Sequence, residues 1–125
     1  MSFLLLSVDH INAIHDEVLE LNELQGMAGD KSLEGALSRV DNRLKYGLID
    51  DIYSLAESYA AAISQAHCFN DGNKRTAFQV MDLILDLNGI NVIWDVEAVG
   101  QKIVLLSQSK LDEADLAQWL RQAVV

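Results

Sequence analysis

The stretch IYSLAESYAAAISQAHCFNDGNKRTAFQVMDLILDL, residues 52–87, decides the fold of this chain. Two apolar segments in it flank a dense polar run, His67–Thr76. In the first segment, 52–66, apolar residues recur every three or four positions, a spacing that puts them on one face of a helix. Several of these residues are alanines, which let neighbouring helices approach closely. The pattern therefore predicts that 52–66 is the central helix of a bundle and that it ends at the polar run.

The second apolar segment predicts a helix that starts inside the polar run and ends at Asn88-Gly89. The helical period resumes after Gly72. Its apolar positions are Ala77, Val80, Met81, Ile84, Leu85 and Leu87. An Asn-Gly pair is a good stop signal, because glycine readily takes the left-handed conformation that ends many helices.

A further helix is predicted near the N-terminus. Ser7 or Asp9 is placed to cap its start, because both side chains can accept a hydrogen bond from a free backbone N–H group. The apolar positions that follow have helical spacing and predict one buried face. They are Ile11, Ile14, Val18 and Leu21.

The other segments also have the period of helices. The segment 25–30 contains two glycines and predicts a loop, whose last residue, Asp30, is placed to cap the next helix. That helix is expected over Leu33–Tyr46, and two more are expected over Val96–Ser107 and Leu111–Ala123.

The arrangement as a whole predicts an all-α fold. Residues 90–94 alternate weakly and suggest a short extended piece, but one such run cannot form a sheet without a partner. No repeat, low-complexity tract or linker divides the sequence. We therefore expect one domain over 1–125, a single compact bundle of about six helices, with the polar loop between the third and the fourth.

Charge and composition exclude several classes of function. The net charge is -10, from 19 acidic and 9 basic residues, so phosphate backbones and anionic membranes would be repelled. The single cysteine, Cys68, cannot form an internal disulfide. The apolar run near the N-terminus is too short for a signal peptide or a membrane span. We expect a cytoplasmic protein with no direct role in binding nucleic acid or membranes.

The polar run 67–76 has the features of an anion site. The first N–H groups of a helix lack intrahelical partners and favour an anion. Lys74 and Arg75, the only adjacent basic pair in the chain, lie at this end and oppose the helix dipole. A bound phosphate would resolve that conflict, because arginine can grip two of its oxygens while lysine adds a point charge. Without such context, two neighbouring cations would more often be a solvated face.

Other residues of the run suggest a transfer reaction. His67 is close to the anion site, and a neutral imidazole is the usual base for a hydroxyl proton; the alternative is a histidine that only satisfies the last helix carbonyls. Asp71 can either cap the next helix or hold a magnesium ion. Gly72 allows the backbone to approach a ligand. Together these residues predict phosphoryl or nucleotidyl transfer.

The run HCFNDGNKR, 67–75, resembles the signature of the Fic family, usually written HPFxxGNGR, and more closely its Doc branch, in which NKR replaces NGR. The likeness extends to Ile14-His15-Asp16 and to LEGALSR at 33–39. Lys74, where AMP-transferring relatives have glycine, and Phe78, where they have a second arginine, both match the Doc branch. Cys68 departs from the usual proline.

The resemblance implies a toxin kinase of a toxin–antitoxin system. It implies that ATP presents its γ-phosphate to a threonine of elongation factor Tu, and that a Phd-like antitoxin silences the enzyme. It also implies roles for individual residues: His67 as catalytic base, Asp71 in catalysis as the ligand of Mg²⁺, and Gly72, Asn73, Lys74 and Arg75 at the phosphates of ATP. The alternatives are an AMP-transferase and a non-catalytic module that binds an antitoxin.

Two histidines of the first predicted helix, His10 and His15, have no such role in this interpretation. Their spacing is not that of zinc-binding pairs on a helix, so we expect both to be structural.

Overall fold

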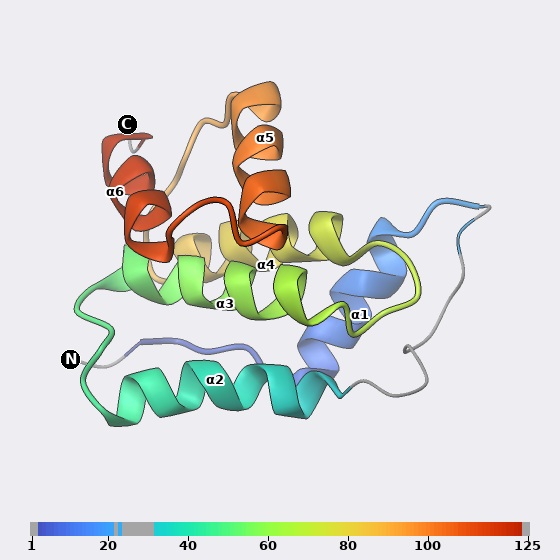
Figure 1. Ribbon diagram of the computed structural model, residues 1–125, viewed down its shortest axis with the longest axis horizontal. Coiled ribbons are helices and arrows are strands. Elements are labelled where there is room, and N and C mark those ends of the chain that lie inside the picture. Colours follow the sequence, from blue (N-terminus) through green and yellow to red (C-terminus); the bar gives the residue numbers. More distant parts are fainter. Residues whose placement is uncertain (1–2, 22, 24–31, 124–125) are drawn as a thin grey trace.

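The computed structural model describes residues 3–21, 23 and 32–123, which form an all-α bundle (Figure 1). Six helices are present in this part of the chain. They are α1 (Val8–Val18), α2 (Leu33–Lys45), α3 (Ile52–Ala66), α4 (Asn73–Leu87), α5 (Val96–Ser107) and α6 (Glu113–Ala123). The predicted fold class is confirmed.

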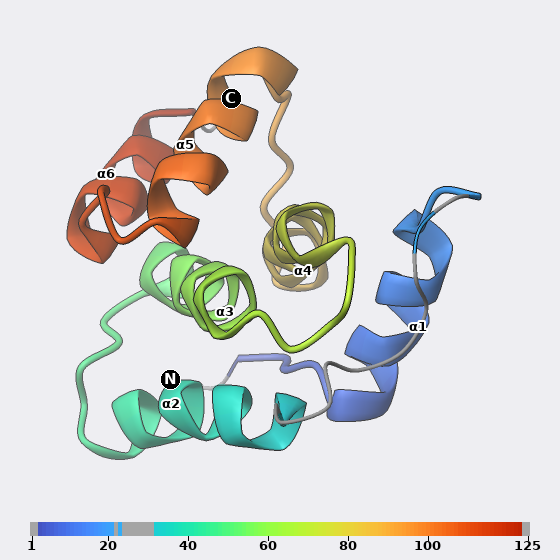
Figure 2. The ribbon, with the colours of Figure 1, turned by 45° about the vertical axis from the view of Figure 1, so that its right-hand side comes forward.

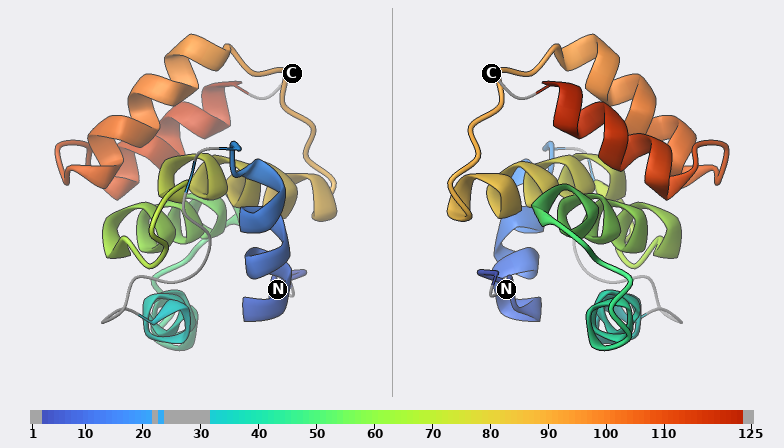
Figure 3. Two further views of the ribbon diagram at one scale, coloured as in Figure 1. Left: turned by 90° about the vertical axis from the view of Figure 1, so that its right-hand side faces the viewer. Right: turned by 90° about the vertical axis from the view of Figure 1, so that its left-hand side faces the viewer.

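The helix α3 is the centre of the bundle. It packs against α2, α4, α5 and α6, and every residue from 55 to 64 is buried. A helix that is buried on all sides must be surrounded by other elements. Figure 2 shows α3 and α4 side by side in the middle, with α2 on one side of α3, α5 and α6 on the other, and α1 beyond α4. Figure 3 shows the same layers from both ends.

Side chains cap the N-termini of α1, α2, α3 and α5. Ser7 caps α1 in a reciprocal capping box with His10, which confirms one of the two expected caps. Asp51 and Asp95 cap α3 and α5. The cap expected for α2, Asp30, lies outside the described residues, and the observed cap of α2 is Ser32.

The predicted bounds are wrong at three helix ends. The helix α2 ends at Lys45, one residue before the expected Tyr46, which is its C-cap. The helix α1 ends at Val18, because Leu19 is extended, so Leu21 is fully exposed instead of contributing to the buried face. The helix α6 begins at Glu113 and not at Leu111. There Asp112 accepts the first helical hydrogen bonds, through its backbone carbonyl from Leu116 and through its side chain from Ala114.

The connection from α4 to α5 anchors the C-terminal pair of helices. The Trp94 indole donates a hydrogen bond to Asp82 at 2.8 Å and packs edge-on against Phe78, with ring centroids 5.3 Å apart. Trp94 also stacks on Trp119 of α6. These contacts fix the segment that leads into α5 against α4 and α6. No helix in the described part of the chain combines the length and the apolar character that crossing a membrane requires.

Candidate active site

The polar run forms the turn between α3 and α4. His67 ends α3 in the left-handed conformation, with φ 49° and ψ 45°, and its side chain is exposed. A non-glycine residue in this region is strained and persists only where its surroundings fix it. The rest of the turn must therefore be held firmly.

Hydrogen bonds of Asn73 close the turn on itself. Its side-chain nitrogen donates to the carbonyl of Phe69 at 2.9 Å, and its side-chain oxygen accepts from the N–H of Phe69 at 3.1 Å. Phe69 is buried, as expected of a core anchor. Cys68 is also buried, and its thiol donates to the carbonyl of Ser32 at 3.4 Å. The turn is thus tied both to α4 and to the start of α2.

His15 of α1 supports the same turn from beneath. Its ring stacks on Phe69, with centroids 3.7 Å apart and planes at 8°. Its Nε2 lies 2.6 Å from the carbonyl oxygen of Asp71. Only 1% of the His15 surface is exposed. The sequence predicted that His15 is structural but did not predict this contact. The resemblance of Ile14-His15-Asp16 to Doc proteins was the one feature of the sequence that could have pointed to it.

The start of α4 has the form of an anion nest. Gly72 is its N-cap, with φ 81°, and has no side chain that could cap the helix. The carbonyl of Gly72 accepts the first helical hydrogen bond, from Thr76, so the N–H groups before Thr76 lack this kind of partner. A Cβ atom on Gly72 would lie 3.2 Å from Leu19, which shows how closely α1 approaches the turn. Asp71 precedes the N-cap and is not the cap itself.

A polar cavity of about 520 Å³ opens over this nest. All six residues that the sequence predicted for the site line it, together with two that it did not predict. The lining consists of Glu23, His67, Asn70, Asp71, Gly72, Asn73, Lys74 and Arg75. The fold therefore brings the candidate base, the cations and the helix N-terminus to one place.

Acidic residues after α1 occupy the cationic side of the cavity. The Arg75 guanidinium donates a hydrogen bond to Glu23 and forms a second ion pair with Glu20 at 3.6 Å. The bond from Arg75 lowers the pKa of the Glu23 carboxyl, and the bond to Glu23 raises the pKa of Arg75. Periodicity and motif give no sign of this pairing, because Glu23 lies outside the polar run.

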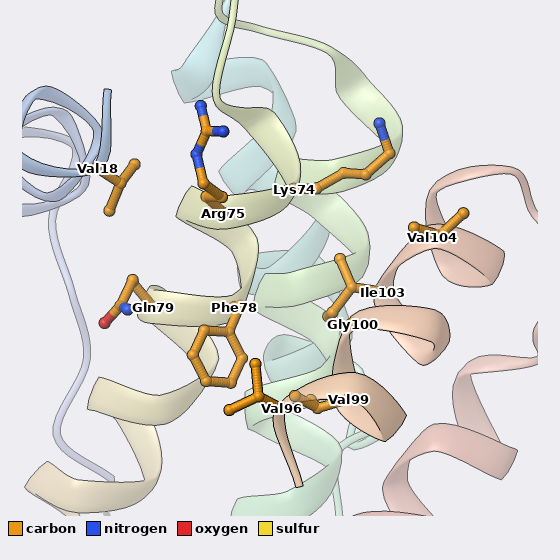
Figure 4. A pocket seen from close by; sticks show the side chains of 10 residues that line it. All are labelled: Val18, Lys74, Arg75, Phe78, Gln79, Val96, Val99, Gly100, Ile103 and Val104. Carbon is orange, nitrogen blue, oxygen red and sulfur yellow. The ribbon is translucent and has the colours of Figure 1, made fainter. Parts of the chain in front are cut away.

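A second space, an apolar groove of about 400 Å³, lies between α1, α4 and α5. Lys74 and Arg75 line both spaces. In Figure 4 they lie at one end of the groove, while Phe78 projects from the next turn of α4 towards Val96. A groove with an apolar wall and a cationic end can receive a ligand that combines a flat apolar group with phosphates.

The donors at the cavity suit magnesium only when phosphate oxygens complete its coordination. Within the described residues no group of three or more His, Cys, Asp or Glu side chains could hold a metal ion by itself. Magnesium commonly uses one or two carboxylates plus substrate phosphates, and Asp71 supplies one carboxylate here.

Comparison with known proteins gives one family. The model of the Fic/DOC family matches residues 5–85, which include α1 to α3, the polar turn and most of α4. A relative from Escherichia phage P1, "Protein kinase doc", is 30% identical over 118 residues, which cover 94% of this chain and 93% of the relative. The match spans the whole candidate site. The chain belongs to the Fic/DOC family.

Proposed function

We propose that this chain is the toxin of a toxin–antitoxin system and acts in the cytoplasm as a protein kinase. It transfers the γ-phosphate of ATP to a threonine hydroxyl of elongation factor Tu and so arrests translation. One observation carries the proposal: His67, Lys74, Arg75 and the N-terminus of α4 line a single open cavity. The relative named "Protein kinase doc" supports the choice of a kinase.

His67 is the proposed catalytic base. Its side chain is exposed at the mouth of the turn, where a hydroxyl of another protein can reach it. A neutral imidazole takes the proton as the hydroxyl oxygen attacks the γ-phosphorus. The bond from this phosphorus to the oxygen that bridges it to the β-phosphate breaks, and ADP leaves. The left-handed backbone of His67 holds the ring at the cavity, at the cost of local strain.

The start of α4 is the proposed phosphate site. Lys74 and Arg75 neutralise the phosphates, and the backbone N–H groups of Gly72 and Asn73 add donors. Asn73 acts through its backbone, because its side-chain amide already holds Phe69. Asp71 would hold magnesium, which when bound would supply positive charge next to the phosphates.

The apolar groove is the proposed site of the nucleoside. With the phosphates at Lys74 and Arg75, an adenosine lies against Phe78 and the wall of α5. The charge of Lys74, and Phe78 in place of a second arginine, favour presentation of the γ-phosphate to the protein substrate. AMP transfer is the runner-up.

ATP labelled at either the γ- or the α-phosphate tests the direction of transfer. After incubation with elongation factor Tu, the γ-label should enter the factor on threonine and the α-label should not. Label entering only from the α-position would instead establish AMP transfer. A factor that stays unlabelled from both positions would refute elongation factor Tu as the target.

Substitution of His67 separates catalysis from binding. We choose His67→Asn, because asparagine tolerates the left-handed conformation yet cannot serve as the base. The variant should lose phosphate transfer and growth inhibition while it binds ATP with affinity within about threefold of the parent. Undiminished growth inhibition would favour the non-catalytic module that only binds an antitoxin.

The antitoxin is proposed to be a Phd-like protein whose C-terminal segment folds as a helix on the toxin. Co-expression with such a protein from a neighbouring gene should restore growth. Failure of every neighbouring small protein to do so would refute this part of the proposal and leave the kinase assay unaffected.

A further inference from the structure

We propose that His15 is a positioning residue of the anion site: it pins the Asp71–Gly72 peptide so that the N–H of Gly72 faces the bound phosphate. The kinetic part of this inference rests on the proposed kinase function. The structural part rests on contacts of His15 alone.

The hydrogen bond of His15 fixes the orientation of one peptide group. The acceptor is the carbonyl oxygen of Asp71, so the Nε2 atom of His15, 2.6 Å away, must carry the proton. No peptide bond in the described residues is cis. In a trans peptide the N–H points opposite to the C=O. With the Asp71 carbonyl held towards His15, the Gly72 N–H points away from it.

The cavity lies on that other side. Gly72 and Asp71 line the cavity, whereas His15 does not line it and is 1% exposed. His15 therefore contacts the turn from the core, and the turn separates it from the anion site. Rotation of the peptide by half a turn would aim the Asp71 carbonyl at the phosphates and repel them. The bond from His15 opposes this rotation.

The position of His15 is itself well fixed. Its ring stacks on Phe69, whose backbone the Asn73 side chain holds. Its Nδ1 lies 3.6 Å from the Asp16 carboxylate. A buried ring that stacks on Phe69 loses little entropy in making the bond, and a partly buried carbonyl that loses its donor carries a free-energy penalty.

Two substitutions separate the hydrogen bond from the packing. His15→Phe keeps the stacked ring and removes the donor. His15→Gln loses the ring, but its side-chain nitrogen is as many bonds from Cα as Nε2 of histidine and can donate to the same carbonyl. The matched control is His10→Phe, the same change on the same helix, at an exposed residue of the capping box.

Binding of inorganic pyrophosphate, measured by calorimetry, is the first readout. His15→Phe should weaken it about tenfold, the effect of losing one partly buried hydrogen bond, while His15→Gln should stay within about threefold of the parent. His10→Phe should lower the melting temperature and leave pyrophosphate binding unchanged. In the kinase assay His15→Phe should raise the KM for ATP more than it lowers kcat, and His10→Phe should change neither by more than about twofold.

Hydrogen exchange of the turn is a second readout that needs no ligand. His15→Phe should speed amide exchange across 67–75 about tenfold relative to His15→Gln, with exchange in α3 unchanged. If His15→Phe does not fold, His15→Asn replaces it as the donor-free variant. Like glutamine, asparagine lacks the ring, but its side chain is too short to reach the Asp71 carbonyl.

The outcomes distinguish this inference from the proposed function. Equal losses in His15→Gln and in the donor-free variant would show that only packing matters and would overturn the inference. Unchanged pyrophosphate binding and exchange in the donor-free variant would overturn it as well. A parent protein that transfers no phosphate would refute the kinase proposal alone, because neither pyrophosphate binding nor exchange depends on it.

Discussion

The guanidinium of Arg75 is hydrogen-bonded to the carboxylate of Glu23, so the arginine of the anion site already has a negative partner within the chain. Both residues line the same polar cavity. A phosphate that binds Arg75 must therefore compete with Glu23. The pair also accounts for the lowered pKa of Glu23, because the bond from Arg75 favours the ionised carboxyl.

The change Glu23→Gln should strengthen phosphate binding. It removes the negative charge that competes for Arg75. Because a partly exposed ion pair contributes little free energy, the expected gain in pyrophosphate affinity is about two- to fivefold. Calorimetry at low and high salt measures the gain, which should shrink as salt rises. Asp41→Asn, which removes one exposed charge from α2 outside the cavity, should leave the affinity unchanged. An equal gain in both variants would attribute the effect to net charge.

Stability should depend on pH through Glu57 of α3. Burial raises the pKa of this carboxyl to about 7, repulsion from Glu113 adds to the shift, and Arg43, 3.1 Å away, only partly offsets it. One oxygen of Glu57 has no hydrogen-bond partner among the described residues. The unfolded chain releases this proton near pH 4.5 and the folded chain near pH 7. The free energy of unfolding should therefore decrease as the pH rises from 4.5 to 7, by roughly 3 kcal/mol at most.

The variant Glu57→Gln isolates this dependence, since glutamine resembles the protonated acid and does not titrate. Parent and variant should unfold at similar urea concentrations at pH 4.5, and the variant should become the more stable of the two by pH 8. Parallel curves over this range would show that the pKa of Glu57 is the same in the folded and the unfolded chain, and would refute the shift.

Filling the apolar groove should block the nucleoside and spare the phosphates. Gly100 lines the groove on α5, and a Cβ atom there would meet no atom within 4 Å. Gly100→Leu should therefore fold well, with improved helix propensity. It should weaken ATP binding about tenfold or more and leave pyrophosphate binding unchanged. Gly100→Ala, the matched control, should change both by less than about threefold. Unchanged ATP binding in Gly100→Leu would place the nucleoside elsewhere.

Asp51 should stabilise the protein at two helices at once. It caps α3 by accepting from the N–H of Ser54 at 2.9 Å, and it accepts from Arg121 of α6 at 2.8 Å. Burial raises the pKa of Asp51, but the bonds from Arg121 and Ser54 outweigh it and hold the pKa below its usual value. This contribution to stability is therefore present at neutral pH and lost as the pH falls through the lowered pKa. Asp51→Ala should cost about 1 kcal/mol or more in urea unfolding. Asp51→Asn, which keeps a cap, should cost less.

Local signals determined most of the fold and the candidate site. The periodicity and the stop at Asn88-Gly89 predicted α3 and α4 closely, and the bounds of α5 agree at both ends. Such patterns suffice because the helical period, caps and glycine stops act within a few residues. For the same reason the predicted site residues, which are contiguous from 71 to 75 with His67 just before them, line one cavity.

Helix ends that depend on other elements were less predictable. Leu21 fits the period of α1, but the chain leaves the helix at Leu19, which packs close to Gly72 of the distant turn. The packing of α1 against α4 therefore decides where α1 ends. No residue pattern within α1 indicates this position.

The sequence by itself determined that a histidine, two cations and a helix N-terminus would meet around a glycine turn. Only the tertiary structure decided which residue supports the turn and which residue competes with a phosphate for Arg75. His15 and Asp71 are separated by 56 positions, and Glu23 and Arg75 by 52. Hydrophobic periodicity says which face of a helix is buried, but not which residue of another helix it will meet. That choice depends on how α1 packs across α4, where burial of apolar surface sets the distance and leaves His15 and Glu23 within hydrogen-bonding reach of the turn.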